Sequence, residues 1–452
     1  MKKNEILDIV IEDIRFPNTG IVQVGERLLE VKGALPGQRL SVRVIKKGKT
    51  NRAVAQEVIS PAPEQIALAC SQFGTCGGCA FLHIPYEYEL ELKTKMVKDL
   101  FADFNMEEKF LPSVGSPENG YRNKMEYSFG DDGNENGILM LGMRKKGSFY
   151  EAIDASGCLL VHADFGKILT ATVEYFRGVG EHFYHRRKAV GTLRHLTVRH
   201  GRASNEILVN LVTTGGNNYA EYADALLRLP LENEIVGVLN TTTNSIADAI
   251  IPDEVKLLHG RDYYFETLSN ISYKVPAFAF YQTNSKMVET LYNTIADMAG
   301  EIENKTIFDL YCGAGTIGKF LAKKGAKRVV GVEIVPEAVA SAMEDAPPNC
   351  EFIAGDVKQI VKELKESPDV IILDPPREGI VPKAIPNILA FDAKKIVYVS
   401  CKPTSFVQNL QAFLDGGYSV ENIVCVDMFP RTANVEVVCS MVKNEHPQIE
   451  QV

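Results

Sequence analysis

The sequence predicts a multidomain protein with a small N-terminal β-barrel of the OB type, a central α+β domain and a C-terminal, doubly wound α/β domain. Three observations predict this fold class. The chain has 452 residues, which suits two to four domains. Short apolar segments separated by Gly, Pro and Asn occupy residues 1–60. From about residue 302 onward, strand patterns alternate with helix patterns.

The N-terminal barrel is predicted from five short segments in residues 1–60, namely ILDIVIEDI, GIVQVGE, LLEVKGA, QRLSVRVIKK and RAVAQEVI. Five such strands suit an OB-type barrel, which commonly binds oligonucleotides. Pro61 and Pro63 then mark a linker. Residues 64–270 form the central domain, with a cysteine cluster, a long helix near residues 86–104 and later strand-like segments. Their periodicity does not fix a topology.

The third domain covers residues 271–452 and contains the strand patterns TIFDLY, RVVGVEIV, EFIAGD, VIILD and KIVYVS. Helical patterns between them predict a parallel sheet whose ligand lies at the carboxyl ends of the strands. Two further strands, IVCVDM and VEVVCSM, lie close together in the sequence, which allows an antiparallel edge.

The composition is globular, with 45% hydrophobic and 24% charged residues. We expect a cytoplasmic protein with no membrane partner, because the sequence has no apolar run of 18 residues and no secretory signal at its start. The nine cysteines do not suggest a disulfide scaffold. In a reducing compartment, clustered cysteines more often bind metal or take part in chemistry.

Positive charge is concentrated in three places, although the net charge is -9. Residues 39–52 contain six Lys or Arg and no acid, and Arg144, Lys145 and Lys146 form another cluster. Residues 182–205 also lack acids and contain six basic residues, which are Arg186, Arg187, Lys188, Arg194, Arg199 and Arg202. Each run alone could be a solvated surface. Together, in an acidic protein, they favour a binding site for a polyanion.

A glycine turn connects a predicted strand to a predicted helix. Residues 309–318 read DLYCGAGTIG, which has the G-x-G-x-x-G form, and Glu333 ends the next strand about twenty residues later. Such an acid can accept hydrogen bonds from both hydroxyls of an adenosine ribose. The turn indicates an adenosine cofactor but does not separate a nicotinamide dinucleotide from S-adenosylmethionine.

Two further motifs follow predicted strand ends. VIILD ends in Asp374-Pro375-Pro376-Arg377, and two prolines fix an extended turn that projects the acid into the cofactor cleft. A plain loop is the alternative, but the proline pair at this edge favours S-adenosylmethionine binding.

Cys401 follows strand KIVYVS at the same edge, ahead of a helix that begins near Pro403. A helix N-terminus and the neighbouring Lys402 would stabilise a thiolate there. The alternative is a buried cysteine that acts as a small hydrophobe. The strand-end position favours a nucleophile, whereas Cys425 and Cys439 lie within apolar strands and are predicted to be core residues.

Three cysteines lie within ten residues, as Cys70-x5-Cys76-x2-Cys79, and Cys158 is isolated downstream. The cluster suits thiolates that converge on one metal centre, with Cys158 as the candidate fourth ligand. Four thiolates can hold zinc or an iron–sulfur cluster, and the spacing does not choose between them. Unrelated cysteines are the alternative.

These motifs together resemble the RNA uracil-C5 methyltransferases. The stretches Cys70-x5-CGGC, YRNKMEYSF, FYQTN, DLYCGAGTIG, VEIV, DPPREG, SCKP and DMFPRTANVEVV occur in order along nearly the whole chain. The sequence is most similar to the branch with an N-terminal TRAM barrel and a [4Fe-4S] cluster. The resemblance implies that residues 1–60 are the TRAM domain, that the cysteines hold iron–sulfur and not zinc, and that the C-terminal domain is a Rossmann-like methyltransferase domain. It also implies that the helix near residues 86–104 packs with this domain.

The resemblance implies that the protein forms 5-methyluridine in RNA, most often 23S ribosomal RNA, with transfer RNA as the alternative substrate. Cys401 is implied to add to carbon 6 of an extruded uracil, and Glu436 in NVEVV to remove the carbon-5 proton. Without the family, Glu436 would be interpreted as a surface acid on an edge strand. The implied cofactor contacts are Gln282, Tyr311, Glu333 and Asp374. The barrel and the basic runs would hold the RNA.

Three features depart from the family pattern. Lys402 replaces the usual Asn, Arg431 and Asn434 replace two histidines before the base, and the stretch after Glu333 lacks its usual asparagine pair. Arg431 adds a charge that could bind a phosphate.

Two other classes of function remain as alternatives. A dinucleotide-dependent oxidoreductase would leave DPPR, Cys401 and the cysteine cluster unexplained. A catalytically silent RNA-binding protein would use only the barrel and the basic runs. No obligate protein partner is evident. Which RNA is modified, at one position or two, the role of the cluster and the oligomeric state do not follow from the sequence.

Overall fold

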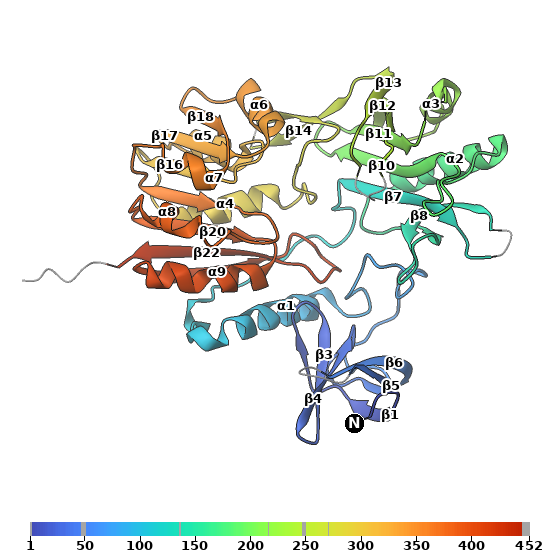
Figure 1. Cartoon of the computed structure of the whole chain (residues 1–452), viewed down its shortest axis with the longest axis horizontal. Coiled ribbons are helices and arrows are strands. Elements are labelled where there is room, and N and C mark those ends of the chain that lie inside the picture. Colours follow the sequence, from blue (N-terminus) through green and yellow to red (C-terminus); the bar gives the residue numbers. More distant parts are fainter. Residues whose placement is uncertain are drawn as a thin grey trace, which may run out of the picture. The chain divides into compact units, whose positions relative to one another are not determined.

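The computed structural model describes residues 2–46, 51–134, 137–215, 217–245, 250–269 and 271–444 (Figure 1). The chain divides into two compact units. The first unit comprises Met1–Ala67, His83–Ser116 and Thr290–Val452, and the second comprises Leu68–Leu82 and Pro117–Glu289. Each unit therefore combines segments that are far apart in the sequence. None of the helices in the described ranges has the length and apolarity needed to span a membrane.

The N-terminal part of the first unit is a six-stranded sheet with the order β1-β5-β6-β4-β3-β2. Its strands are β1 (Ile6–Val10), β2 (Asp13–Arg15), β3 (Thr19–Val24), β4 (Arg27–Lys32), β5 (Arg39–Lys46) and β6 (Asn51–Ser60). The predicted strand-rich N-terminal segment is confirmed, with six strands in place of the five predicted. The segment predicted as one strand, ILDIVIEDI, is two, because the chain turns at Ile11, whose backbone N–H donates to Gln38.

The C-terminal part of the first unit contains a seven-stranded sheet with the order β18-β17-β16-β19-β20-β22-β21. The strands are β16 (Thr306–Leu310), β17 (Arg328–Glu333), β18 (Cys350–Ala354), β19 (Val370–Leu373), β20 (Lys395–Ser400), β21 (Tyr418–Val426) and β22 (Glu436–Lys443). The first five are parallel, and β22 is antiparallel to both β20 and β21. The predicted doubly wound sheet with an antiparallel edge is confirmed, and the last strand lies inside that edge.

Helices follow the strands as the alternating pattern predicts. They are α4 (Val288–Ala299), α5 (Thr316–Lys323), α6 (Pro336–Glu344), α7 (Val357–Ile360), α8 (Ile385–Leu389) and α9 (Pro403–Asp415). Successive residues of β16 point to opposite faces of the sheet. Phe308 packs in a core cluster with side chains of α8 and α9, whereas Asp309 on the other face contacts α5. Helices therefore cover both faces and leave the strand ends accessible to a ligand.

Helix α1 (Tyr86–Leu100), with short 3₁₀ turns at Ala102–Phe104 and Glu107–Lys109, packs within the first unit although it is far upstream of α9 (Figure 1). Phe101, just after α1, lies with its ring centroid 5.8 Å from that of Phe406 in α9. Val97 and Phe101 are buried in the same cluster as Phe308. The helix therefore supplies part of the core of the C-terminal sheet.

The second unit is built on a seven-stranded sheet with the order β13-β12-β11-β10-β7-β8-β9 and a separate β14–β15 hairpin. The strands are β7 (Lys124–Asp131), β8 (Leu139–Arg144), β9 (Ala152–Asp154), β10 (Leu193–Gly201), β11 (Glu206–Thr213), β12 (Glu234–Thr242), β13 (Glu254–Gly260), β14 (Tyr263–Leu268) and β15 (Ile271–Pro276). Helices α2 (Ala163–Val179) and α3 (Ala220–Leu227) pack on the sheet through one hydrophobic core. This is an α+β arrangement.

Candidate active site

The glycine turn between β16 and α5 is tightly packed. Tyr311, the first residue after β16, has a left-handed φ of 67°, and its backbone N–H donates to Val332 at 2.9 Å. Gly315 has φ 69°, and a Cβ there would lie 2.4 Å from the ring of Phe352. The turn therefore requires glycine and holds Tyr311 in a conformation that non-glycine residues rarely adopt, as is common at functional sites.

Acidic side chains fix both ends of this turn. The N–H of Gly318 donates to Asp309 Oδ2 at 2.9 Å, which holds α5 against β16. Glu333, at the end of β17 as predicted, accepts from the N–H of Gly313 at 3.0 Å and from the N–H of Val335 at 3.0 Å. Each carboxylate oxygen of Glu333 has a second lone pair, so the side chain is oriented and can still accept from a ligand.

The sheet topology brings Asp374, Cys401 and Glu436 to one edge. Asp374 and Cys401 are the first residues beyond the carboxyl ends of β19 and β20, which are parallel neighbours. β22 runs antiparallel to β20 with Val437 opposite Ser400, so Glu436, its first residue, lies next to Cys401. Three side chains that are distant in the sequence therefore meet where the fold class predicts a ligand.

The two carboxyl groups of this cluster are in an environment that disfavours their charge. Glu436 is 4% exposed, and burial together with the negative charge of Asp374 raises its pKa to about 8. Burial also raises the pKa of Asp374 to about 7. Within the described residues, Glu436 Oε2 has no hydrogen-bond partner. Buried acids with such strongly raised pKa values are typical of functional sites.

The thiol of Cys401 is half-buried, and burial is the main cause that raises its pKa, to about 11. The charges of Glu436 and Asp374 raise this pKa further, whereas the charge of Arg377 and its hydrogen bond to the thiol lower it. Sequence reasoning named Lys402 as the neighbouring cation and gave Arg377 no role. The motif that contains Asp374 could have indicated this role, because Arg377 follows Asp374 on the turn beside β20.

Two further cysteines lie in the core of the sheet. Cys425 and Cys439 are both fully buried, in β21 and β22, which confirms their assignment to the core. Helix α9 begins at Pro403, as predicted, with Lys402 at its N-cap position.

Gln282 belongs to the second unit, whereas Tyr311, Glu333 and Asp374 belong to the first. The side chain of Asn123, in the YRNKMEYSF stretch, donates to the carbonyl of Gln282 at 2.9 Å and to Ser285 Oγ at 2.7 Å. Ser285 Oγ in turn donates to Glu266 at 2.9 Å. The FYQTN segment is therefore fixed by two other segments of its own unit. This function of Asn123 could not be deduced from the motif alone.

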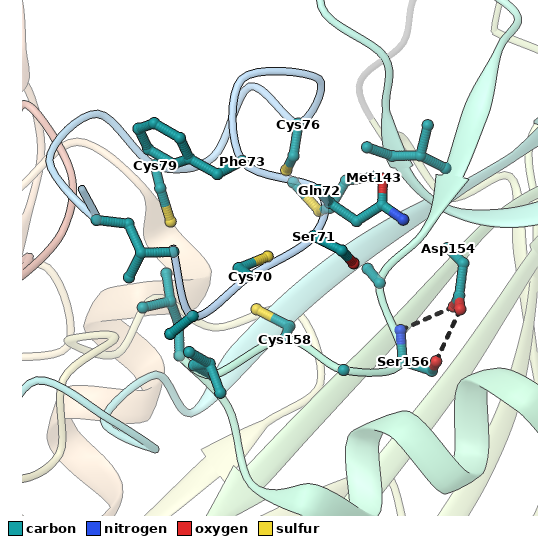
Figure 2. A pocket seen from close by; sticks show the side chains of 17 residues that line it. Cys70, Ser71, Gln72, Phe73, Cys76, Cys79, Met143, Asp154, Ser156 and Cys158 are labelled. Atoms are coloured by element: carbon teal, nitrogen blue, oxygen red, sulfur yellow. Dashed lines mark hydrogen bonds between the residues drawn. The ribbon is translucent and has the colours of Figure 1, made fainter. Parts of the chain in front are cut away.

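All four cysteines of the predicted metal site line one cavity of about 270 Å³ in the second unit (Figure 2). Cys70, Cys76 and Cys79 come from one loop and Cys158 from the segment after β9, and none forms a disulfide. The loop is attached to the segment that follows β8, since the N–H of Lys146 donates to the carbonyl of Thr75 at 2.9 Å. Burial raises the pKa of both Cys76 and Cys158.

These four cysteines do not form a compact site for a single ion. No three His, Cys, Asp or Glu side chains of the described residues converge closely enough to hold one metal ion. A tetrahedral zinc site would require thiolates at about 2.3 Å from one centre. The four side chains instead surround a wider space, as Figure 2 shows.

The basic runs contain both buried and exposed residues, which the sequence does not show. Arg194 is 5% exposed and donates to the carbonyls of Thr243 and Ser245, and Arg199 is 4% exposed and donates to Ala279. These two arginines are therefore structural, and only part of the run at 182–205 is on the surface. The exposed members are Arg187, Lys188 and Arg202. In the first run, Lys47 and Lys49 lie outside the described residues.

The expectation that Arg431 binds a phosphate is wrong. Its side chain is 8% exposed, and its guanidinium group lies 3.4 Å from the carboxylate of Glu89 in α1. An arginine that is buried against a carboxylate does not present its charge to RNA.

The comparisons with known proteins agree with the motifs. The family described as tRNA (Uracil-5-)-methyltransferase matches residues 356–444, and a general methyltransferase domain matches residues 307–384. An uncharacterized RNA methyltransferase of Clostridium tetani is 42% identical over 450 residues, which cover 98% of each chain. The chain belongs to the RNA uracil-C5 methyltransferases. It is therefore an S-adenosylmethionine-dependent RNA methyltransferase.

Further similarities support this RNA methyltransferase assignment. A second uncharacterized RNA methyltransferase, from Caldanaerobacter subterraneus, is 41% identical over 448 residues, or 97% of this chain and 99% of the relative. Among solved structures, the Pyrococcus abyssi tRNA (uracil-54, C5)-methyltransferase in complex with S-adenosyl-L-homocysteine matches with a TM-score of 0.77. The match covers 96% of this chain and 100% of that one at 24% identity, so it shows the shared fold.

The contacts of Cys401 predict how its reactivity depends on pH. Because Arg377 favours the thiolate, Arg377→Ala is expected to raise the pKa of Cys401 further. The thiolate fraction at a given pH then falls, and the alkylation profile moves to higher pH by about one pH unit. The measurement is the rate of iodoacetamide labelling of the Cys401 peptide by mass spectrometry between pH 7 and 11.

Lys402→Ala is the matched control, because Lys402 is exposed and adjacent in sequence. An unchanged profile in Arg377→Ala, or an equal shift in Lys402→Ala, would show that Arg377 does not control this thiol.

Proposed function

We propose that this RNA methyltransferase forms 5-methyluridine through a covalent bond between Cys401 and carbon 6 of the target uracil. The observation that supports the proposal is the adjacency of Cys401 and Glu436 at the carboxyl edge of the sheet, with Asp374 beside them. A nucleophile and a base on neighbouring strands can act on adjacent atoms of one ring. The target base must leave its stack to reach them.

The atoms and electrons of this reaction balance without a redox partner. The Cys401 thiolate forms a bond to carbon 6, and the resulting enolate attacks the methyl group of S-adenosylmethionine from carbon 5. The bond between sulfur and methyl breaks and releases S-adenosylhomocysteine. The Glu436 carboxylate then takes the proton from carbon 5, and the electron pair of that bond expels the thiolate. Glu436 must be ionised for this step; a pKa of about 8 makes its carboxylate a stronger base than usual but leaves the group mostly protonated at neutral pH.

We assign cofactor binding to Tyr311, Glu333, Asp374 and Gln282. Glu333 is oriented by two backbone N–H groups and would accept from the ribose hydroxyls. The N-terminus of α5 and the glycine turn lie beside it. Asp374 would contact the amino acid part of the cofactor, whose ammonium and sulfonium groups favour a carboxylate. Gln282 is held at its carbonyl by Asn123.

We propose that Cys70, Cys76, Cys79 and Cys158 hold a [4Fe-4S] cluster. Four free thiols around a cavity of about 270 Å³ fit a centre larger than a single ion. When bound, such a cluster would cross-link the loop of Cys70–Cys79 to the segment of Cys158. Its role is structural, because the methyl transfer needs no electrons.

We propose ribosomal RNA as the substrate, held by a TRAM-type N-terminal sheet and by exposed residues such as Arg187 and Lys188. Transfer RNA is the second candidate, because the matching family and the Pyrococcus abyssi enzyme both carry that substrate in their names.

The covalent mechanism predicts opposite behaviour for two variants. Cys401→Ala is expected to abolish both methylation and the release of tritium from [5-³H]uridine RNA, because no carbon-6 adduct forms. Glu436→Gln is expected to methylate carbon 5 and then retain the RNA, because the carbon-5 proton cannot be removed. This adduct would appear as a slower band on a denaturing gel, and only when S-adenosylmethionine is present.

Methylation by Cys401→Ala would show that another nucleophile acts. An absence of tritium release by the wild-type enzyme on all RNA would favour the catalytically silent RNA-binding protein instead.

The cluster proposal predicts the metal content of single variants. Cys158→Ser is expected to lower the iron and sulfide content and the visible absorbance of anaerobically purified protein, because one of four ligands is lost. Cys350→Ser is the matched control and should retain the iron, since Cys350 lies in β18, in the other unit. Zinc in the wild-type protein, or iron content that is equal in both variants, would contradict the assignment.

The substrate is tested by mapping 5-methyluridine in total RNA from cells with and without the gene. Loss of one or two positions in large-subunit ribosomal RNA, restored by the wild-type gene and not by Cys401→Ala, is the expected result. Loss confined to transfer RNA would identify the second candidate.

A further inference from the structure

Four charged side chains form a buried cluster in the first unit, between α1 and the segment that connects β21 to β22. Glu89 and Lys93 come from α1, and Asp427 and Arg431 come from the connecting segment. The side chains of the first three are 0% exposed and that of Arg431 is 8% exposed. The cluster contains two positive and two negative groups, so its charges balance.

The contacts in this charged cluster join α1 to the connecting segment at several points. Lys93 Nζ lies 2.7 Å from Glu89, 2.9 Å from Asp427 and 3.1 Å from the carbonyl of Phe429. The hydroxyl of Tyr86 donates to Asp427 at 3.0 Å. One lysine and one tyrosine of α1 therefore fix the start of the segment.

Arg431 fixes the middle of the segment. Its backbone N–H donates to Glu89 Oε1 at 2.7 Å, and its guanidinium donates to the carbonyl of Ile84 at 2.8 Å and to Glu89 Oε2 at 3.4 Å. Its φ is 68°, in the left-handed region that is unfavourable for a residue with a Cβ. Glu89 thus stabilises a backbone conformation that the segment would not adopt by itself.

Only four residues separate Arg431 from Glu436, the first residue of β22. Within them, Thr432 Oγ1 donates to the carbonyl of Phe429 at 2.8 Å and accepts from the N–H of Asn434 at 3.2 Å. Hydrogen bonds therefore constrain this short connection as far as Asn434. A change in the conformation of Arg431 would be transmitted to the position of Glu436.

Stability alone does not explain the charged cluster. Removing charges from water costs several kcal/mol per ion, and well-packed hydrophobic side chains often stabilise a core as well or better. Buried charges that bond to specific backbone atoms do fix geometry. In this cluster, Glu89 and Lys93 bond to the backbone of the segment that precedes Glu436.

We propose that Glu89 and Arg431 are positioning residues that set the location of Glu436 for removal of the carbon-5 proton. The inference rests on the proposed function of Glu436 as the base. It also gives a role to Arg431, which departs from the family pattern.

The test compares Arg431→Lys and Glu89→Gln with the control Glu91→Gln, which makes the same change at an exposed position of α1. Lysine keeps the charge but lacks the guanidinium group whose Nη1 bonds to both Ile84 and Glu89. We expect kcat for methylation to fall roughly ten- to a hundred-fold in both variants with a nearly unchanged KM for RNA, because the base is displaced. The control should match the wild type.

Accumulation of the covalent adduct separates positioning from general destabilisation. Arg431→Lys should build up the same slow-moving RNA–protein band as Glu436→Gln, whereas a merely unstable enzyme would form less adduct. Thermal unfolding monitors folding, and Glu89→Gln provides the second variant if Arg431→Lys does not fold.

The two possible failures are distinguishable. If Glu436→Gln traps the adduct but both positioning variants turn over without it, the present inference is wrong and the proposed mechanism stands. If Glu436→Gln itself traps no adduct, the assignment of Glu436 as the base is wrong, and the positioning role of Glu89 and Arg431 is then wrong as well.

Discussion

The site depends on the hydrogen-bond register between β20 and β22. Ser400 pairs with Val437, so the residue after one strand and the residue that begins the other are neighbours. Antiparallel insertion of β22 is what allows this, because a parallel strand would bring its own carboxyl end to the edge. A thiol and a carboxyl group thus meet on rigid elements of the sheet, where the ladder of backbone hydrogen bonds between β20 and β22 resists small displacements.

The same packing places ionisable groups where their charged forms are disfavoured. Burial raises the pKa values of Cys401, Glu436 and Asp374. The negative charge of Asp374 further raises the pKa values of Glu436 and Cys401, and that of Glu436 raises the pKa of Cys401. Arg377 opposes this for Cys401 and Glu436. A bound sulfonium would add a second positive charge and lower the pKa values of nearby carboxyls. Cofactor binding would therefore help to ionise Glu436, the proposed base.

Much of this arrangement is predictable from local patterns, and the rest depends on long-range contacts. The glycine turn, the strand ends of Asp374 and Cys401 and the start of α9 follow from periodicity and turn residues. The position of β22 within the sheet does not, because register is a tertiary property. Nor does the partner of Arg431, since Glu89 lies far upstream. Arg194 and Arg199 show the same limit, because a basic run does not reveal which of its members are buried.

The upstream helix α1 belongs structurally with the C-terminal sheet, although it lies far from that sheet in the sequence. Residues 83–116 belong to the first unit, although the second unit separates them in sequence from Thr290. Helix α1 contributes Val97 and Phe101 to the core and supplies Glu89 and Lys93 to Asp427 and Arg431. A chain that began at residue 271 would lack both these partners and the apolar contacts of Val97 and Phe101. The first unit is thus completed by a segment synthesised before most of the second unit, and hydrogen bonds link this segment to the residues that precede Glu436, the proposed base.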